Sequence, residues 1–326
     1  MTHIVGIDIA KDTFDVCLVS GANQPEVASF ANGKTGMKQL QQWLKKRAVK
    51  TAHVCLEATG VYGDLLAETL YERGFTVSVV NPARINAYAA SRMQRNKTDA
   101  LDAALIADYC RTQQPPAWTP PASELKELRA LVRHLDDLKD ERQRARNRLE
   151  AQTVSQAVAR QLKQQVTFLE QQIAETEALI RNHVNQHPDL KRQRDLLKSI
   201  PGIGHLTACQ LLAEVGDMQR FDHVGEVVAF IGLNPRQHQS GKKQTTHGIS
   251  RMGRASLRAA LYLPAVVAKQ HNPRLKDWAQ QLSARGLTGK QVIVAVMRKL
   301  VHLAYGVLKH QQPFDPHYLD KRLLIA

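Results

Sequence analysis

Short apolar, β-branched runs alternate with helical stretches over the first third of the chain, and this alternation limits the fold more than any other feature. Residues 4–9 and 13–19 flank a turn at 10–12 and predict a β-hairpin, to which 27–30 adds a third strand. The other expected elements are helices over 36–47, 62–73 and 99–110 and strands over 52–57 and 75–80. Strands that alternate with helices after an opening hairpin indicate an α/β domain with a mixed sheet over residues 1–112.

A proline-rich segment, residues 113–121, follows this domain. It contains Pro115-Pro116 and Pro120-Pro121, which cannot continue a helix and are typical of a stiff linker. We therefore expect a domain boundary here.

Leucine and other aliphatic residues then recur at spacings of three and four over residues 122–188. The first group begins at Leu125 and Leu128, and the second at Leu162 and Val166. This rhythm predicts two long helices that form an antiparallel hairpin or an intermolecular coiled coil. The alternative is a helical spacer that packs on its own domain.

The last part, residues 189–326, is expected to be a compact all-α domain. Its segment 199–204 contains Gly202 and Gly204 and resembles a helix-hairpin-helix element. In that element a glycine turn exposes backbone N–H groups to a DNA phosphate. The alternative is an ordinary corner between two packed helices.

The charge of the chain points to a polyanionic partner. The 326 residues carry a formal net charge of +15, for which nucleic acid is the default interpretation. We expect no membrane partner, because no apolar run approaches the roughly 20 residues that span a bilayer. The first residues lead directly into a strand without a signal-peptide pattern, so we expect a cytoplasmic, bacterial-type protein. The four cysteines are isolated, which argues against structural zinc and disulfides.

Four acidic residues could meet at one edge of the predicted sheet. Asp8 interrupts an apolar strand, and Glu57 ends another. Asp99 and Asp102 are three residues apart, hence on one helical face. Each alone has an ordinary explanation, such as accepting turn N–H groups or complementing a helix N-terminus. Their order, however, matches the ribonuclease H-like arrangement, in which paired metal ions act on a phosphodiester.

A second candidate region contains cations without acids. No acidic residue lies between Glu226 and Asp277, although nine basic residues do, as expected of a phosphate-binding stretch. Within it, Ser240 precedes a glycine and two lysines in what we interpret as a loop. The hydroxyl could donate a hydrogen bond to a phosphate or attack one. Ser250 and Ser256 compete with it on composition. The basic residues that we expect to bind nucleic acid are Arg236, Lys242, Lys243, Arg251, Arg254 and Arg258.

Several short motifs, taken together, resemble one family over nearly the whole chain. They are Gly6-Ile7-Asp8-Ile9-Ala10-Lys11, Glu57-Ala58-Thr59-Gly60, Asn81-Pro82-Ala83, Asn96-Lys97-Thr98-Asp99-Ala100-Leu101-Asp102-Ala103, Ile200-Pro201-Gly202-Ile203-Gly204 and Gln239-Ser240-Gly241. The sequence thus resembles the DEDD transposases of the insertion-sequence family numbered one hundred and ten, relatives of the Piv DNA invertase.

The resemblance implies a mechanism and partners. Asp8, Glu57, Asp99 and Asp102 match the family's RuvC-like acidic tetrad, which binds Mg²⁺, and Ser240 matches its nucleophilic serine in the C-terminal transposase domain. Family members are recombinases guided by a structured non-coding bridge RNA that pairs with target and donor DNA. The resemblance also implies a tetramer of two dimers, in which the RuvC-like domain of one subunit completes a site with the serine of another.

Two other functions stay open on the sequence. A RuvC-type junction nuclease would use water in place of Ser240, and a nucleic-acid-binding scaffold would use the acids only as caps and turns. A sugar-kinase-like or actin-like fold also begins with a Gly-x-Asp strand, but we find no second phosphate-binding glycine loop of that type.

Overall fold

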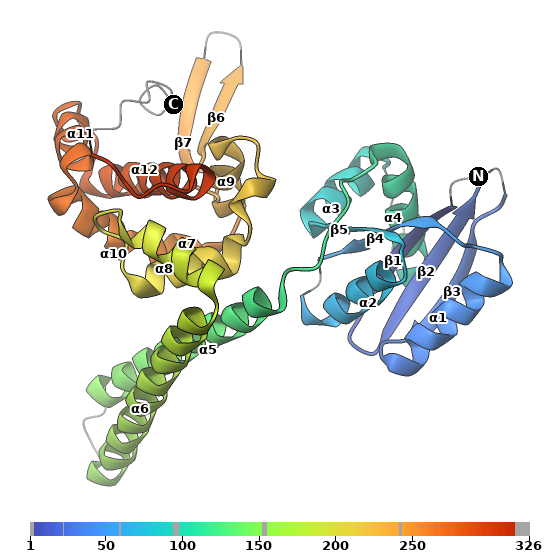
Figure 1. Ribbon diagram of the computed structural model, residues 1–326, viewed down its shortest axis with the longest axis horizontal. Coiled ribbons are helices and arrows are strands. Elements are labelled where there is room, and N and C mark those ends of the chain that lie inside the picture. The colour runs from blue at the N-terminus through green and yellow to red at the C-terminus, as the bar shows by residue number, and fades with distance from the viewer. Residues whose placement is uncertain are drawn as a thin grey trace. The chain divides into compact units, whose positions relative to one another are not determined.

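The computed structural model describes residues 3–21, 23–58, 60–93, 98–151, 155–240 and 243–316 (Figure 1). The chain divides into two compact units, Met1–Pro120 and Pro121–Ala326.

The first unit is built on a five-stranded mixed sheet with the strand order β3-β2-β1-β4-β5. Its strands are β1 (His3–Ile9), β2 (Thr13–Ser20), β3 (Glu26–Ala31), β4 (Ala52–Glu57) and β5 (Thr76–Val80). The first three strands pair antiparallel, whereas β4 and β5 join β1 in parallel. The mixed α/β sheet expected from the sequence is thus confirmed, and β1 lies at its centre.

Helices cover both faces of this sheet (Figure 1). The helices of this unit are α1 (Lys34–Lys46), α2 (Val61–Glu72), α3 (Pro82–Ser91) and α4 (Asp99–Gln113). On one face α1 and α2 pack against the sheet through buried residues such as Leu40 and Leu66. On the other face α4 and α3 bury Ile106 and Ile85. Alternate residues of each central strand therefore enter two separate apolar layers.

The proline-rich segment lies along the outer strand β5 for part of its length. The Ser78 hydroxyl donates to the carbonyl of Pro116 at 2.8 Å, and the backbone N–H of Trp118 donates to the carbonyl of Val77 at 2.6 Å. These bonds satisfy polar groups at the open edge of the sheet.

The second unit begins with two long antiparallel helices, α5 (Ser123–Ala151) and α6 (Gln156–Gln186). Ion pairs join Lys139 to Glu177 and Arg146 to Glu170. The residue that is later in α5 pairs with the one that is earlier in α6, as antiparallel helices require. Leucines at the predicted spacing, such as Leu128 and Leu135, are buried between the helices and the rest of the unit.

The remaining helices form one apolar core with the base of this pair. They are α7 (Pro188–Lys198), α8 (His205–Val215), the 3₁₀ helix η1 (Met218–Arg220), α9 (Val224–Ile231), α10 (Ala255–His271), α11 (Pro273–Ala284) and α12 (Gly289–His310). By length and composition α12 could cross a membrane. Its apolar residues, including Val296 and Leu300, are instead buried in this core, as in the central helix of a globular unit.

The prediction that this unit is all-α is wrong. A β-hairpin formed by β6 (Pro235–Ser240) and β7 (Lys243–Ile249) projects from it, with Ser240 opposite Lys243 (Figure 1). The segment is polar and lacks the alternating apolar residues that identify a half-buried strand, which is why we interpreted it as a loop. Thr245 and Thr246 are the β-branched signals that favour a strand here.

Candidate active site

The sheet places Asp8 and Glu57 beside each other. In the parallel pairing of β1 with β4, Ile7 lies opposite Leu56, so the next residues on the two strands are Asp8 and Glu57. Both side chains are half-buried. They stand near the carboxyl ends of neighbouring parallel strands, which is where α/β proteins commonly bind ligands.

Helix α4 brings the other two acids to the same edge. Gly6 lies so close to α4 that a Cβ atom there would meet the Ala103 carbonyl and the Ala107 backbone nitrogen at 2.3 Å. Farther along the helix, the Cys110 thiol contacts the carbonyl of His53, near the start of β4. Because α4 therefore runs opposite to β1 and β4, its first turn reaches the ends of those strands. That turn contains Asp99 and Asp102.

The first turn of α4 is fixed by its cap. The Thr98 hydroxyl accepts a hydrogen bond from the backbone N–H of Leu101 at 3.3 Å, so Thr98 is the N-cap of this helix. Two carboxylates in this turn also complement the positive end of the helix dipole.

Asp99 and Asp102 lie close enough to Asp8 for their charges to act on it. Burial is the largest cause that raises the pKa of Asp8 above its ordinary value, and the negative charges of Asp102 and Asp99 raise it further. Asp15 makes a smaller contribution of the same sign. A carboxyl group in this position repels its neighbours when it ionises, unless a cation is present.

Asp15 is an acidic neighbour that our sequence analysis did not include. It lies directly opposite Asp8 in the antiparallel pairing of β1 with β2, and residues so paired share one face of the sheet. The predicted hairpin placed Asp15 on the strand beside Asp8, but its turn at residues 10–12 did not give the observed register, in which Ile9 lies opposite Phe14.

The donor set is chemically suited to a hard divalent cation. Mg²⁺ prefers carboxylate oxygens, and the residues gathered here supply several of them. Among the residues that the structure describes, no three His, Cys, Asp or Glu side chains converge closely enough to form a metal site. The acids lie at a common edge of the sheet, but in this structure they are not drawn together around one point. Metal binding therefore stays a prediction.

Asn32 ties together two loops that flank these acids. Its side-chain amide donates to the carbonyl of Ala10 at 2.9 Å and to that of Tyr62 at 3.2 Å. Ala10 follows Asp8 by two residues, and Tyr62 lies in the first turn of α2, just after the segment that follows Glu57. No sequence signal distinguishes this asparagine from an ordinary turn residue, because its role depends on contacts distant in sequence.

Ser240 is the last residue of β6, directly before the turn of the hairpin. Gly241 and Lys242 lie outside the described residues, as do the side chains of residues 237–240 and 243–247, which include Ser240 and Lys243. The competing Ser250 lies at the base of the hairpin, where its hydroxyl donates to the side chain of Asn234 at 2.5 Å. This bond gives Ser250 a structural role.

The predicted basic residues differ in their surroundings. Arg236 and Arg251 are exposed, and Arg251 has a positive φ of 56°. Arg258 instead donates to the carbonyl of Ile231 at 2.9 Å. Arg254 pairs with Glu214 at 3.0 Å and lies over the ring of Phe230. Arg254 and Arg258 therefore also join the start of α10 to α8 and α9.

Glu214 is a buried carboxylate that anchors this region. It is 5% exposed and receives two hydrogen bonds from Arg133 of α5, at 2.7 and 3.2 Å. Burial alone would raise the pKa of Glu214, but the hydrogen bond from Arg133 and the charges of Arg133 and Arg254 bring it below its ordinary value. The ion pairs link α5 and α10 through α8.

The two glycines of the predicted helix-hairpin-helix element have different surroundings. Gly202 has a φ of 107° and lies against α10, where a Cβ atom would meet the Ala268 Cβ at 2.6 Å and the Pro264 carbonyl at 2.8 Å. The part of the turn that contains Gly202 is therefore a corner that packs against α10. Gly204 is exposed at the N-terminus of α8, with no atom within 4 Å of an added Cβ.

Two family models match this chain. A DEDD transposase model of the IS110 type matches residues 5–159, and a model described as "Transposase IS116/IS110/IS902 family" matches residues 194–280. The pilin gene-inverting protein of Moraxella bovis is 35% identical over 317 residues, which cover 95% of this chain and 97% of that protein. The chain belongs to the IS110 family of transposases.

Two more distant relatives of this IS110-family chain are named as transposases. The transposase for insertion sequence element IS1111A of Coxiella burnetii is 26% identical, over 95% of this chain and 91% of that protein. The transposase for IS1328 of Yersinia enterocolitica is 26% identical, over 93% and 96% of the two chains. The first IS110 model covers the four acids, and the second covers Ser240 with the basic residues.

Proposed function

We propose that this IS110-family transposase cuts and rejoins DNA through a covalent phosphoserine at Ser240, with the acids of the first unit as the metal-binding half of the chemistry. The observation that carries the proposal is geometric: the first turn of α4, which contains Asp99 and Asp102, reaches the edge of the sheet where Asp8 lies. The negative charges of these two acids also contribute to the raised pKa of Asp8. We take the first unit to have a RuvC-like fold and the transposase to act in the bacterial cytoplasm.

The reaction balances without an external energy source. The Ser240 oxygen forms a bond to phosphorus, the bond from phosphorus to one sugar oxygen breaks, and the serine proton passes to the released alcohol. The number of phosphodiester bonds is unchanged, so attack by another strand's hydroxyl on the phosphoserine restores a DNA backbone. Strand exchange thus needs no ATP.

The residues of the chain supply the remaining functions. Asp8, Glu57, Asp99 and Asp102 would hold Mg²⁺, which when bound stabilises charge on phosphate oxygens. The acid-free stretch holds the DNA backbone through Arg236 and Arg251, both exposed. Such contacts carry no sequence information, so target choice falls to a partner that can base-pair. We propose a non-coding bridge RNA for that role and a tetramer as the active assembly.

The proposal is tested by trapping the protein–DNA adduct. Purified chain is incubated with its element DNA, its bridge RNA and Mg²⁺, and the products are run on a denaturing gel with and without protease. We expect a protease-sensitive adduct that is lost in Ser240→Ala and in Asp8→Asn, and retained in Ser256→Ala. Cleaved ends without an adduct would favour the junction nuclease instead. Rearrangement that survives Asp8→Asn and Glu57→Gln would favour the scaffold.

A further inference from the structure

Two cysteines that are far apart in sequence meet inside the first unit. Cys55 lies on β4 and Cys110 near the end of α4, and both side chains are fully buried, at 0% exposure. The Cys110 sulfur lies 3.8 Å from the carbonyl oxygen of His53, which precedes Cys55 by two residues on the same strand. The two thiols are hydrogen-bonded to each other. In this structure both are free thiols.

Small residues bring α4 unusually close to the sheet at this point. Gly6 lies directly opposite Cys55 in the parallel pairing of β1 with β4, and an added Cβ there would meet the Ala107 backbone nitrogen of α4 at 2.3 Å. Cys110 follows Ala107 by three residues, about one turn of the helix. A disulfide requires Cα atoms within about 7 Å of each other, and so close an approach of helix and strand favours one.

Cys17 lies in the same apolar layer but on the other side of β1. It is opposite Gly6 in the antiparallel pairing of β1 with β2, so a whole strand separates it from Cys55. Two strand spacings amount to about 9.5 Å, which is beyond the reach of a disulfide. The fold thus favours Cys110, not Cys17, as the partner of Cys55.

Cys110 has the properties of a reactive thiol. The hydrogen bond from the Cys55 thiol and, to a lesser extent, the interactions with His53 lower the pKa of Cys110 to about 6, although burial acts in the opposite direction. The thiolate is the form of cysteine that attacks an oxidant.

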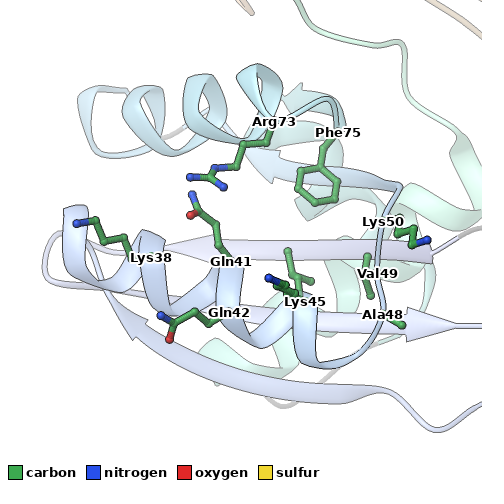
Figure 2. A pocket seen from close by; sticks show the side chains of 10 residues that line it. Lys38, Gln41, Gln42, Lys45, Ala48, Val49, Lys50, Arg73 and Phe75 are labelled. Carbon is green, nitrogen blue, oxygen red and sulfur yellow. The ribbon is translucent and has the colours of Figure 1, made fainter.

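Access to the two thiols depends on α4. The groove between α1 and α2, with a volume of about 810 Å³, lies on the opposite face of the sheet, and neither thiol lines it (Figure 2). An oxidant therefore reaches Cys55 and Cys110 by local opening of α4, not through this groove. Native proteins expose buried groups by such openings.

We propose that Cys55 and Cys110 are a reversible redox pair, which a peroxide converts to a disulfide that fastens α4 to β4. The Cys110 sulfur attacks one peroxide oxygen and the O–O bond breaks. A sulfenic acid forms, and the released hydroxide takes up the proton that Cys110 lost, giving water. The Cys55 sulfur then attacks the Cys110 sulfur, the S–O bond breaks, and a second water leaves with the Cys55 proton.

The electrons of this reaction balance with the peroxide as the only oxidant. Two electrons pass from the thiols to the peroxide, which is reduced to two molecules of water. A thiol reductant reverses the bond, so in a reducing cytoplasm the disulfide is transient.

The effect of this disulfide on activity rests on the proposed function. Among the described residues the acids share an edge of the sheet but are not gathered around one point. A cation that draws them together therefore shifts the first turn of α4 relative to β1 and β4. A covalent bond near the other end of α4 resists that shift, so the oxidised chain should cut DNA more slowly than the reduced chain.

Peptide mapping of the full-length chain tests the pair directly. Reduced protein is treated with hydrogen peroxide, remaining thiols are blocked with N-ethylmaleimide in denaturant, and tryptic peptides are identified by mass spectrometry. Each cysteine lies in a different tryptic peptide, namely 12–34, 51–73, 98–111 or 199–220. We expect 51–73 joined to 98–111 by a bond that dithiothreitol cleaves, with titratable thiols falling from four to two. The melting temperature of the first unit should rise by about 5 °C or more.

Two matched variants each remove one buried thiol from the same layer. Cys110→Ala should lose the linked peptides and the rise in melting temperature, whereas Cys17→Ala, which is equally buried, should keep both. DNA cutting should fall on oxidation and recover with dithiothreitol in the wild type and in Cys17→Ala, but not respond in Cys110→Ala. The comparison of oxidised with reduced wild type needs no substitution, so a folding defect in a variant does not affect it.

Defined results would overturn the assignment. These are a link between any other two cysteine peptides, a link that forms only in denaturant, a loss of thiols without a link, or an unchanged melting temperature. Linked peptides with unchanged DNA cutting would refute the effect on activity. Mapping and melting need neither DNA nor metal, so failure of the recombinase proposal and failure of this one are distinguishable.

Discussion

His302 gives the helical unit a defined sensitivity to acid. Its side chain is buried in α12 at 2% exposure, and neither ring nitrogen has a hydrogen-bond partner among the described residues. Burial lowers the pKa of His302 to about 4 from its ordinary value of 6.5, and the nearby charges of Lys299 and Arg298 contribute. The neutral ring is therefore the form that fits the folded chain.

The sign and size of the pH effect on stability follow from the difference between the pKa of His302 in the folded chain and its ordinary value. Between pH 6.5 and about 4 the unfolded chain binds a proton at this histidine and the folded chain does not, so stability falls as the pH falls. Above pH 6.5 both states are neutral and the effect disappears. The full loss is roughly 3 kcal/mol, of which about 2 kcal/mol is reached at about pH 5.

Urea unfolding followed by circular dichroism can isolate this contribution. The free energy of unfolding is compared between wild type and His302→Leu at about pH 7.5 and about pH 5. Other groups titrate in both proteins and cancel, so the leucine variant should gain about 2 kcal/mol relative to wild type on acidification. A difference between the two proteins that is the same at both pH values would refute a buried neutral His302.

Three further predictions concern the site and its supports. Gly6→Ala places a Cβ against the backbone of α4 and should cost about 2 kcal/mol or more in unfolding free energy and lower DNA cutting, whereas Gly33→Ala, with open space, should do neither; equal effects would contradict the packing argument. Mg²⁺ should raise the melting temperature of the wild type but not of Asp8→Asn, which without cation should melt higher than wild type because repulsion is removed. An identical Mg²⁺ response would count against metal binding at these acids. Arg133→Met leaves the buried Glu214 with one fewer partner and should cost about 1–3 kcal/mol by urea unfolding. Arg146→Met breaks an exposed pair and should cost less than about 0.5 kcal/mol; comparable losses would show that burial of Glu214 does not matter.

The elements that follow local sequence rules were predictable. The strand Ala52–Glu57 was predicted with its bounds, because a short, largely apolar run ends before a glycine-containing turn. The N-terminal end of α4 was also predicted, because a capping threonine precedes it. These features placed Glu57, Asp99 and Asp102 on the right elements.

The features that depend on distant contacts were not predictable from one sequence. The sequence left open whether Gly202 belongs to a DNA-binding turn or to a packing corner, and its conformation serves close packing against α10, which begins more than fifty residues later. Arg254 was expected to bind nucleic acid, and it also pairs with the buried Glu214. A pattern of charges cannot show which carboxylate folds against which arginine.

Identification of the modified serine is the most direct test of the central claim. Trypsin cleaves after Arg236 and Lys242, so Ser240 lies in peptide 237–242, whereas Ser250 and Ser256 lie in peptides 244–251 and 255–258. The trapped adduct is digested with nuclease and trypsin and analysed by mass spectrometry. A nucleotide on peptide 237–242 at Ser240 is the predicted result. A nucleotide on either of the other two peptides, or DNA cut with no modified peptide at all, would contradict it.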